Sequence, residues 1–150
     1  MPSSFTNLVY HVVFSTKNRK PLIHGDLREQ LYKYIGGIIR NKRGALLEIG
    51  GISDHVHLVA KFRADVSVAQ MLQHIKANSS KWANEQPKRP ARFAWQTGYS
   101  AFSVSESQIE KVRTYVRNQE RHHRRVSFQD EFRALLRKHG IEFDETYLWS

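Results

Sequence analysis

The chain has 150 residues, a length that fits one domain with a single core. Its 24 lysines and arginines outnumber its 14 acidic residues, and the resulting net charge of +10 favours a polyanionic partner such as nucleic acid. The absence of cysteine excludes disulfide scaffolds, thiol nucleophiles and cysteine-ligated zinc. Because no apolar run approaches the roughly 18 residues of a membrane span and no signal sequence is evident, we expect a cytoplasmic protein without a membrane partner.

The first half of the chain predicts a strand, a helix and a β-hairpin. Apolar residues at every second position predict a strand over residues 5–16. Leucine and isoleucine side chains at helical spacing predict a helix over residues 26–41, which opens on an Asp-x-x-Glu capping box at Asp26. The short apolar runs 45–52 and 56–62, joined by glycine, serine and aspartate, predict the hairpin.

The second half predicts two longer helices, a strand and a short last helix. A Ser-x-x-Gln capping box at Ser67 begins a helix that ends at Pro87. Residues 92–104 predict a fourth strand, and a second Ser-x-x-Gln box at Ser105 begins a helix expected to continue to His122. A short helix over 127–138 and an apolar tail over 141–149 complete the predicted elements.

This order of elements, β-α-β-β-α-β, is the ferredoxin-like pattern, which RRM-like modules share: an antiparallel sheet with two helices on one face. We therefore expect an α+β protein whose other sheet face is open and carries the function, followed by a C-terminal helix that bears a tyrosine. One domain is expected over residues 1–125, with residues 126–150 as a C-terminal extension packed on the same domain. The fold alone does not determine the function.

The segment His55-Val56-His57 lies at the start of the third predicted strand. Because side chains alternate in a strand, Val56 faces the helix-covered core and both histidines point to the open face. Two imidazoles placed in this way can bind one divalent ion. In a chain with eight histidines this spacing also arises by chance, so strand histidines without a ligand are the alternative.

Tyr115 and Gln119 lie four residues apart and share a face of their predicted helix. Alone, the pair is typical of a half-buried tyrosine beside a solvated glutamine. With the two histidines it makes chemical sense, because neutral imidazoles and an amide oxygen hold Mg²⁺ or Mn²⁺ without cancelling its charge. Such an ion would stabilise charge on a scissile phosphate while the tyrosine hydroxyl attacks the phosphorus.

Three further residues near this set have alternative roles. His122 and His123 follow Gln119 by three and four residues, so either is a rival for the third ligand position. Asp54 either accepts a hydrogen bond from a ligand histidine or forms a turn.

Two motifs and three further segments resemble a known family. Asp54-His55-Val56-His57-Leu58-Val59 is similar to the HUH motif (histidine, bulky apolar residue, histidine) of the single-tyrosine transposases of bacterial insertion sequences, the IS200-like group. Tyr115-Val116-Arg117-Asn118-Gln119 is similar to their tyrosine helix. Residues 10–17, 75–81 and 95–99 also resemble segments of these proteins, so the likeness spans residues 5–122. The extension after Arg124 is similar to that of REP-associated tyrosine transposases.

The resemblance implies His55 and His57 as metal ligands, Gln119 as the third ligand and Tyr115 as the nucleophile, within a transposase domain over residues 1–125. It implies a metal-dependent enzyme that cuts single-stranded DNA at hairpin-bearing ends and transfers the strand through a 5′-phosphotyrosine, without a nucleotide cofactor. It also implies a homodimer that works at the nucleoid of a bacterial or archaeal cell.

Basic side chains near such a site would seat the DNA. The candidates for DNA contact are Lys17, Arg19, Lys20, Lys76, Arg117 and Arg121. Two other functions are compatible with parts of the pattern. One is a non-catalytic ferredoxin-like module that binds RNA by base stacking, and the other is an HUH nuclease of the replication-initiator or relaxase type.

Overall fold

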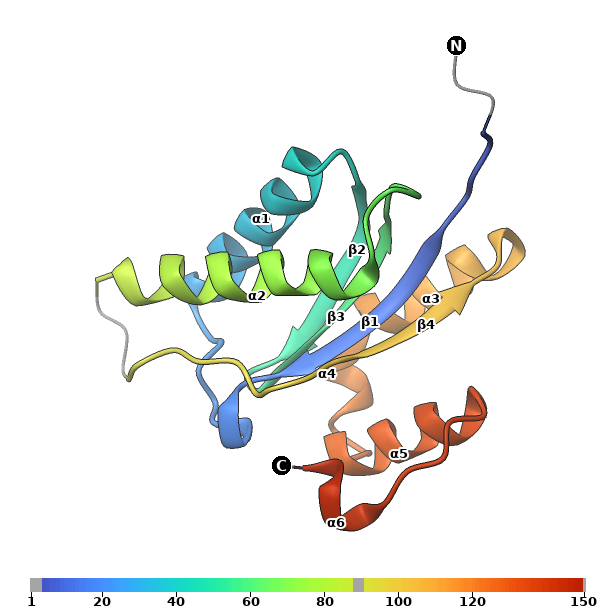
Figure 1. Cartoon of the computed structure of the whole chain (residues 1–150). Coiled ribbons are helices and arrows are strands. Elements are labelled where there is room, and N and C mark those ends of the chain that lie inside the picture. Colours follow the sequence, from blue (N-terminus) through green and yellow to red (C-terminus); the bar gives the residue numbers. More distant parts are fainter. Residues whose placement is uncertain (1–3, 88–90, 150) are drawn as a thin grey trace.

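The computed structural model describes residues 4–87 and 91–149. Its centre is an antiparallel sheet whose strands follow the order β2-β3-β1-β4 (Figure 1). The strands are β1 (Val9–Ser15), β2 (Ala45–Ile52), β3 (His55–Lys61) and β4 (Ser100–Val104). Because one helix connects β1 to β2 and another connects β3 to β4, this is the ferredoxin-like arrangement, and the predicted α+β fold class is confirmed.

Helices α1 (Asp26–Asn41) and α2 (Val68–Glu85) cover one face of the sheet (Figure 1). Even-numbered positions of β1 and β3 point to this face and form the main core with apolar residues of the two helices. The buried members include Val12, Phe14, Leu31, Ile35, Ile39, Val56, Leu58, Leu72 and Ile75. The predicted capping box of α2 is present: the Ser67 hydroxyl accepts a hydrogen bond from the backbone N–H of Gln70, and the Gln70 side chain accepts one from the backbone N–H of Ser67.

The opposite face of the sheet is covered as well, so the prediction of an open face is wrong. Figure 1 shows the C-terminal helices on this side. They are the short η2 (Glu106–Gln108), α3 (Ile109–Arg117), α4 (Gln119–His122), α5 (Phe128–Lys138) and α6 (Glu145–Leu148). Their packing partners on the sheet are Val9 and Val59 against α3, and Val13 and Phe102 against α5. Both faces of β1 and β3 carry apolar residues, and water is therefore excluded from both.

Two predicted elements are shorter than expected. The fourth strand begins at Ser100 rather than residue 92, because Gly98 takes a φ of 89° and Trp95 forms only an isolated bridge with Thr16. The predicted helix from Ser105 to His122 is interrupted at Asn118, which has a φ of −98° and a ψ of 25°. This break separates α3 from α4 and changes the direction of the chain just before Gln119.

Two of the three predicted capping boxes do not form. Helix α1 is preceded by Gly25 at a φ of 59°, so Asp26 is already inside the first turn, where its charge favours the helix dipole. The Ser105 side chain accepts no capping hydrogen bond, and the short η2 helix (Glu106–Gln108) takes the place of the first turn. A 3-10 turn, η1 (Lys17–Arg19), follows β1. Within residues 4–87 and 91–149, none of the helices combines the length and apolar character that a membrane crossing requires.

Candidate active site

His55 and His57 lie on the face of β3 that α3, α4 and α5 cover. Both side chains are fully buried, and their ring centroids are 5.0 Å apart. The alternation of the strand explains this arrangement, because Val56 and Leu58 point to the opposite core. The two imidazoles therefore converge, as predicted from the sequence, but in a closed site rather than on an open surface.

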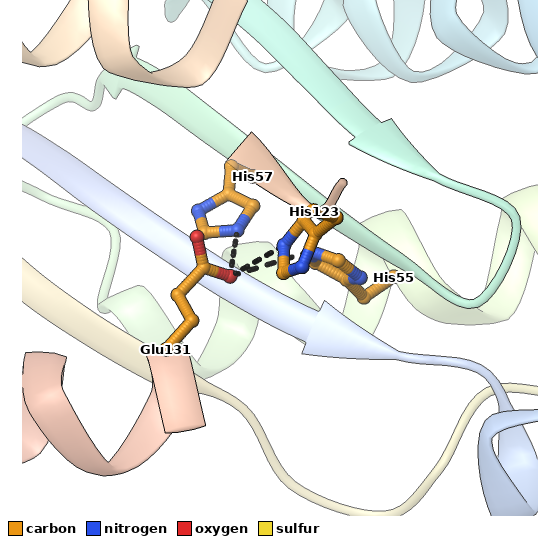
Figure 2. A group of neighbouring side chains, drawn as sticks. All are labelled: His55, His57, His123 and Glu131. Carbon is orange, nitrogen blue, oxygen red and sulfur yellow. Dashed lines mark hydrogen bonds and ion pairs between the residues drawn. The ribbon is translucent and has the colours of Figure 1, made fainter. Parts of the chain in front are cut away.

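The C-terminal segment brings two more groups to this histidine pair. The potential ligand atoms of His55, His57, His123 and Glu131 all lie within 4.8 Å of one another (Figure 2). Oε1 of Glu131 is 3.0 Å from Nε2 of His123, 3.1 Å from Nε2 of His57 and 3.5 Å from Nε2 of His55. Glu131 is only 3% exposed, so its carboxylate is available to these partners and hardly at all to solvent.

Each of the three imidazoles is oriented by a hydrogen bond on its other ring nitrogen. Nδ1 of His55 donates to Oδ1 of Asp54 at 2.8 Å, and Nδ1 of His123 donates to the carbonyl oxygen of Val126 at 2.8 Å. Nδ1 of His57 is hydrogen-bonded to Nε2 of His11, also at 2.8 Å. Partners of this kind fix the ring orientation and tautomer of histidines that bind metals.

Gln119 enters the site because the break at Asn118 turns its side chain inward, where it is fully buried. Its amide oxygen lies 2.9 Å from Nε2 of His123 and 3.1 Å from Nε2 of His55. Its amide nitrogen donates to Oε2 of Glu131 at 3.0 Å. The side chain thus has a fixed orientation, with its oxygen toward the imidazoles.

Tyr115 reaches the same group of side chains from α3. Its hydroxyl donates a hydrogen bond to Oε2 of Glu131, and its ring lies edge-on to those of His57 and His11. The ring is partly exposed and lines a cavity of about 550 Å³ between α3, β4 and α5. The phenol is therefore accessible from this cavity and is not enclosed in the hydrophobic core.

The electrostatics of the site keep its groups in defined protonation states. Burial lowers the pKa of His57 to about 4 and that of His11 to about 3, so both rings are neutral near pH 7, as a metal-binding imidazole must be. Burial and the neighbouring charge of Glu131 raise the pKa of Tyr115, which keeps the phenol protonated. Burial disfavours the charged form of Glu131, but hydrogen bonds from His123, His55 and His57 outweigh it and lower the pKa of this carboxyl.

The donor set fits a divalent cation. When His55 and His123 are neutral and keep their ring protons on Nδ1, directed at Asp54 and Val126, their Nε2 lone pairs can bind a cation in place of the hydrogen bonds to Gln119 and Glu131. Without an ion these nitrogens share protons with the oxygens, and a bound cation would take the place of those protons. Imidazole nitrogens with amide and carboxylate oxygens are suitable ligands for such an ion.

The basic residues proposed for DNA contact have different environments. Nζ of Lys76 donates to the backbone oxygens of Gln96 and Gly98 and so stabilises the loop before β4. The guanidinium of Arg19 stacks on the ring of Trp149, whereas Lys17 and Lys20 are exposed. Arg117 pairs with Glu48 at 2.9 Å.

Arg121 lines a cleft between α1, β2 and the junction of α3 with α4. The cleft has a volume of about 350 Å³, and three further arginines, Arg28, Arg117 and Arg124, also line it. Within the described part of the chain, Arg121 and Arg124 take part in no ion pair, whereas Arg28 pairs with Glu120. The cleft therefore keeps two uncompensated positive charges.

Two residues of the site, His11 and Glu131, were not predicted from the sequence. His11 occupies the same face of β1 as Val13, which pairs with His57 in the sheet, so the period-two pattern places it near the histidine pair. Glu131 lies on the apolar face of α5 with Phe128 and Leu135. A carboxylate on an otherwise apolar helix face is a sequence signal for a functional residue. Its partners, however, depend on how α5 docks.

The comparisons with known proteins all indicate the same family. The family model described as "Transposase IS200 like" matches residues 4–119. The transposases of insertion sequence element IS200 from Salmonella typhimurium and Salmonella typhi are each 26% identical over 118 residues, which covers 75% of this chain and 77% of theirs.

Solved structures show the same fold. A candidate transposase from Deinococcus radiodurans matches with a TM-score of 0.62 and 20% identity, over 79% of this chain and 95% of that one. A REP-associated tyrosine transposase bound to a REP hairpin matches with a TM-score of 0.57 and 11% identity, over 77% of this chain and 68% of that one. Since the family model covers most of the chain, including the histidine pair, Tyr115 and Gln119, this protein belongs to the IS200-like transposase family.

Proposed function

We propose that this protein cuts and rejoins single-stranded DNA at hairpin-bearing ends, with Tyr115 as the nucleophile. One observation carries the proposal: the Tyr115 hydroxyl and the His55–His57 pair contact the same buried carboxylate, Glu131. The tyrosine and the histidine pair are thereby held in one small site, which is the arrangement that phosphoryl transfer to tyrosine requires.

The reaction follows from the residues in contact. Oη of Tyr115 attacks the scissile phosphorus, and the bond from phosphorus to the 3′ oxygen breaks, which leaves a 5′-phosphotyrosine and a free 3′ end. The phenol proton passes to Glu131, the carboxylate that already accepts its hydrogen bond, and the departing 3′ oxygen takes a proton from water. Attack by a 3′-OH on the phosphotyrosine reverses the step and transfers the strand, so no nucleotide cofactor is consumed.

His55, His57 and Gln119 would hold a divalent ion, Mg²⁺ or Mn²⁺, in this site. When bound, the ion supplies positive charge that stabilises the scissile phosphate and the leaving oxygen. Asp54 orients His55, and His11 orients His57, so that the Nε2 atoms face the centre.

The substrate class is supported by charge and by a structural neighbour. The chain has a net charge of +10, and one structure of the same fold is a tyrosine transposase bound to a REP hairpin. We propose that the arginine cleft (Arg28, Arg117, Arg121 and Arg124), together with the exposed Lys17 and Lys20, seats the phosphate backbone. A substrate of chromosomal DNA would place this activity at the nucleoid, in the cytoplasm of a bacterial cell.

The structure argues against the alternative of an RNA-binding sheet. Such modules stack bases on an open sheet face, and here helices cover both faces. A buried cluster of histidines and a glutamate has no role in base stacking.

The arrangement also bears on whether one subunit or two subunits supply the residues of the site. Tyr115, both histidines and Gln119 come together within one chain, so we propose that a single chain supplies the complete site. A homodimer stays a prediction. Residues 126–150 are proposed to form an extension integrated with the domain of residues 1–125, since Phe128 and Leu136 pack on Val13 and Phe102 of the sheet.

The test uses a labelled single-stranded hairpin DNA, incubated with the protein and Mn²⁺ and then denatured. A fragment that carries the 3′ end of the substrate is expected to be covalently linked to the protein through its new 5′ phosphate, and this adduct should be lost in Tyr115→Phe. Tyr99→Phe is the matched control, because Tyr99 is an exposed tyrosine in a different cavity, away from the histidines. DNA that is bound but released intact by the wild-type protein would contradict the proposed function.

A further inference from the structure

We infer that the part of the chain after Gln119 completes the metal centre: His123 and Glu131 act as ligands alongside His55, His57 and Gln119, and the centre selects a transition-metal ion over Mg²⁺. This inference deepens the proposed function, since it concerns the ion of the same site. His123 and Glu131 both lie beyond residues 4–119, the part of the chain that matches the family model. The two ligands are therefore supplied by the part of this chain that follows the family match.

The spacing of the atoms supports these ligand roles. Two ligands bound at about 2.1 Å lie about 3.0 Å apart at a right angle and about 3.4 Å apart at a tetrahedral angle. Oε1 of Glu131 is 3.0, 3.1 and 3.5 Å from the three Nε2 atoms, and Oε1 of Gln119 is 2.9 and 3.1 Å from two of them. These separations are those of neighbouring ligands around one ion.

The direction of the lone pairs also suits a shared ion. The Val126 carbonyl only accepts hydrogen bonds, so Nδ1 of His123 carries the ring proton, and in the neutral ring Nε2 presents its lone pair to the cluster. His123 thus has the same orientation as His55, whose proton is directed at Asp54. In Figure 2 the three rings and the carboxylate point toward one another from β3, the segment after α4, and α5.

The segment that carries Glu131 is held rigidly. The Ser127 hydroxyl accepts the backbone N–H of Asp130 and so caps α5, one residue before Glu131. Phe128 is buried and stacks on the ring of His55, with centroids 4.1 Å apart. Because α5 is docked directly on a ligand histidine, Glu131 is held in position before any ion binds, which is the preorganisation that a metal site needs.

The ligand set decides the class of metal. Three imidazoles and two oxygens suit manganese, cobalt or zinc, whereas Mg²⁺ prefers oxygen ligands and retains several waters. Five protein ligands, four of them buried and His123 partly buried, leave little room for those waters. We therefore expect Mn²⁺ and Co²⁺ to bind at least about 100-fold more tightly than Mg²⁺.

The experiment measures metal binding on the full chain, without DNA. The metal-free protein is titrated with MnCl₂, followed by the electron paramagnetic resonance signal of free Mn²⁺, and with CoCl₂, followed by visible absorption. MgCl₂ is measured by competition. The variants are His123→Ala and Glu131→Gln. Their matched controls are His74→Ala, an exposed histidine on α2, and Asp130→Asn, an exposed carboxylate next to Glu131. Circular dichroism of each metal-free variant verifies the fold.

The expected result is a loss of Mn²⁺ affinity of at least about tenfold in His123→Ala and in Glu131→Gln, with an altered Co²⁺ spectrum and no change in either control. Unchanged Mn²⁺ affinity in folded variants would overturn the ligand roles, and equal wild-type affinities for Mg²⁺ and Mn²⁺ would overturn the selectivity. Either result can coexist with a Tyr115-dependent DNA adduct. Conversely, metal binding that depends on both residues in a protein that forms no adduct would reject the proposed function alone.

Discussion

The hydroxyl of Tyr115 donates a hydrogen bond to Oε2 of Glu131, a residue on the helix that follows the tyrosine segment. The other oxygen of this carboxylate, Oε1, faces the three imidazole Nε2 atoms. One buried side chain therefore connects the proposed nucleophile to the proposed metal ligands, and it does so within a single chain. The docking of α5 thus contributes to the position of the phenol relative to the histidines.

The single-chain site predicts that two inactive variants cannot rescue one another. Tyr115→Phe lacks the nucleophile and His57→Ala lacks a ligand, so an equimolar mixture should form no covalent DNA adduct above the level of each variant alone. If tyrosine helices were exchanged between subunits, mixed dimers would contain one intact site and recover up to about a quarter to a half of the activity. The adduct yield of the mixture, with each variant's secondary structure verified by circular dichroism, is the measurement.

Asp54 is expected to strengthen metal binding without touching the ion. Its carboxylate accepts the Nδ1 proton of His55 at 2.8 Å, which orients the ring and raises its basicity as a ligand. Asp54→Ala should therefore weaken Mn²⁺ binding by about 10- to 100-fold, and Asp54→Asn, which keeps an acceptor oxygen, by less. Asp65→Ala, at an exposed aspartate that pairs with Arg63, serves as the control. Equal affinities for wild type and Asp54→Ala would reduce Asp54 to a turn residue.

The histidine pair was predictable because strand alternation depends only on local sequence. The same pattern placed Val56 and Leu58 in the main core and both imidazoles on the other face, and the structure agrees. The covered sheet face was not predicted, although the odd-numbered valines of β1 indicated it. A strand of a buried parallel sheet and an antiparallel strand that is covered on both faces show the same apolar pattern in a single sequence. Which element covers each face depends on tertiary packing.

The break at Asn118 and the role of Glu131 depend on contacts that sequence patterns do not record. Residues 109–122 have helical propensity throughout, and the interruption at Asn118 coincides with the burial of Gln119 among side chains from distant segments. Glu131 similarly approaches the histidines only when α5 lies against β1 and β3. Local patterns thus brought out the histidine pair, Gln119 and Tyr115, whereas the proximity of Glu131 to them required the packed chain.

The arginine cleft predicts a sequence-independent contribution to DNA binding. Arg121→Ala and Arg124→Ala should each weaken binding of a hairpin DNA about equally for all sequences and reduce the slope of log affinity against log salt by about 1, as expected for one lost phosphate contact. Fluorescence anisotropy at several salt concentrations measures both quantities. Arg63→Ala is the control, because Arg63 pairs with Asp65 away from the cleft. An unchanged salt slope in both cleft variants would place the DNA elsewhere.

Gly50 is expected to be essential for the approach of the tyrosine helix to the sheet. A Cβ atom at this position of β2 would lie 2.1 Å from the backbone oxygen of Val116, the residue after Tyr115, so Gly50→Ala must displace α3. We expect a loss of about 1–3 kcal/mol in the free energy of unfolding, measured by urea denaturation with an unchanged m-value.

Gly37 offers the matched control for this substitution. It lies within α1, where the nearest atom to an added Cβ is the far end of the Arg40 side chain at 4.0 Å. Gly37→Ala should therefore stabilise the protein by about 0.5–1 kcal/mol, because alanine loses less backbone entropy in a helix. Similar stabilities for the two variants would show that α3 moves away from β2 at little cost. In that case the close contact between β2 and Val116 could not be what fixes the position of Tyr115.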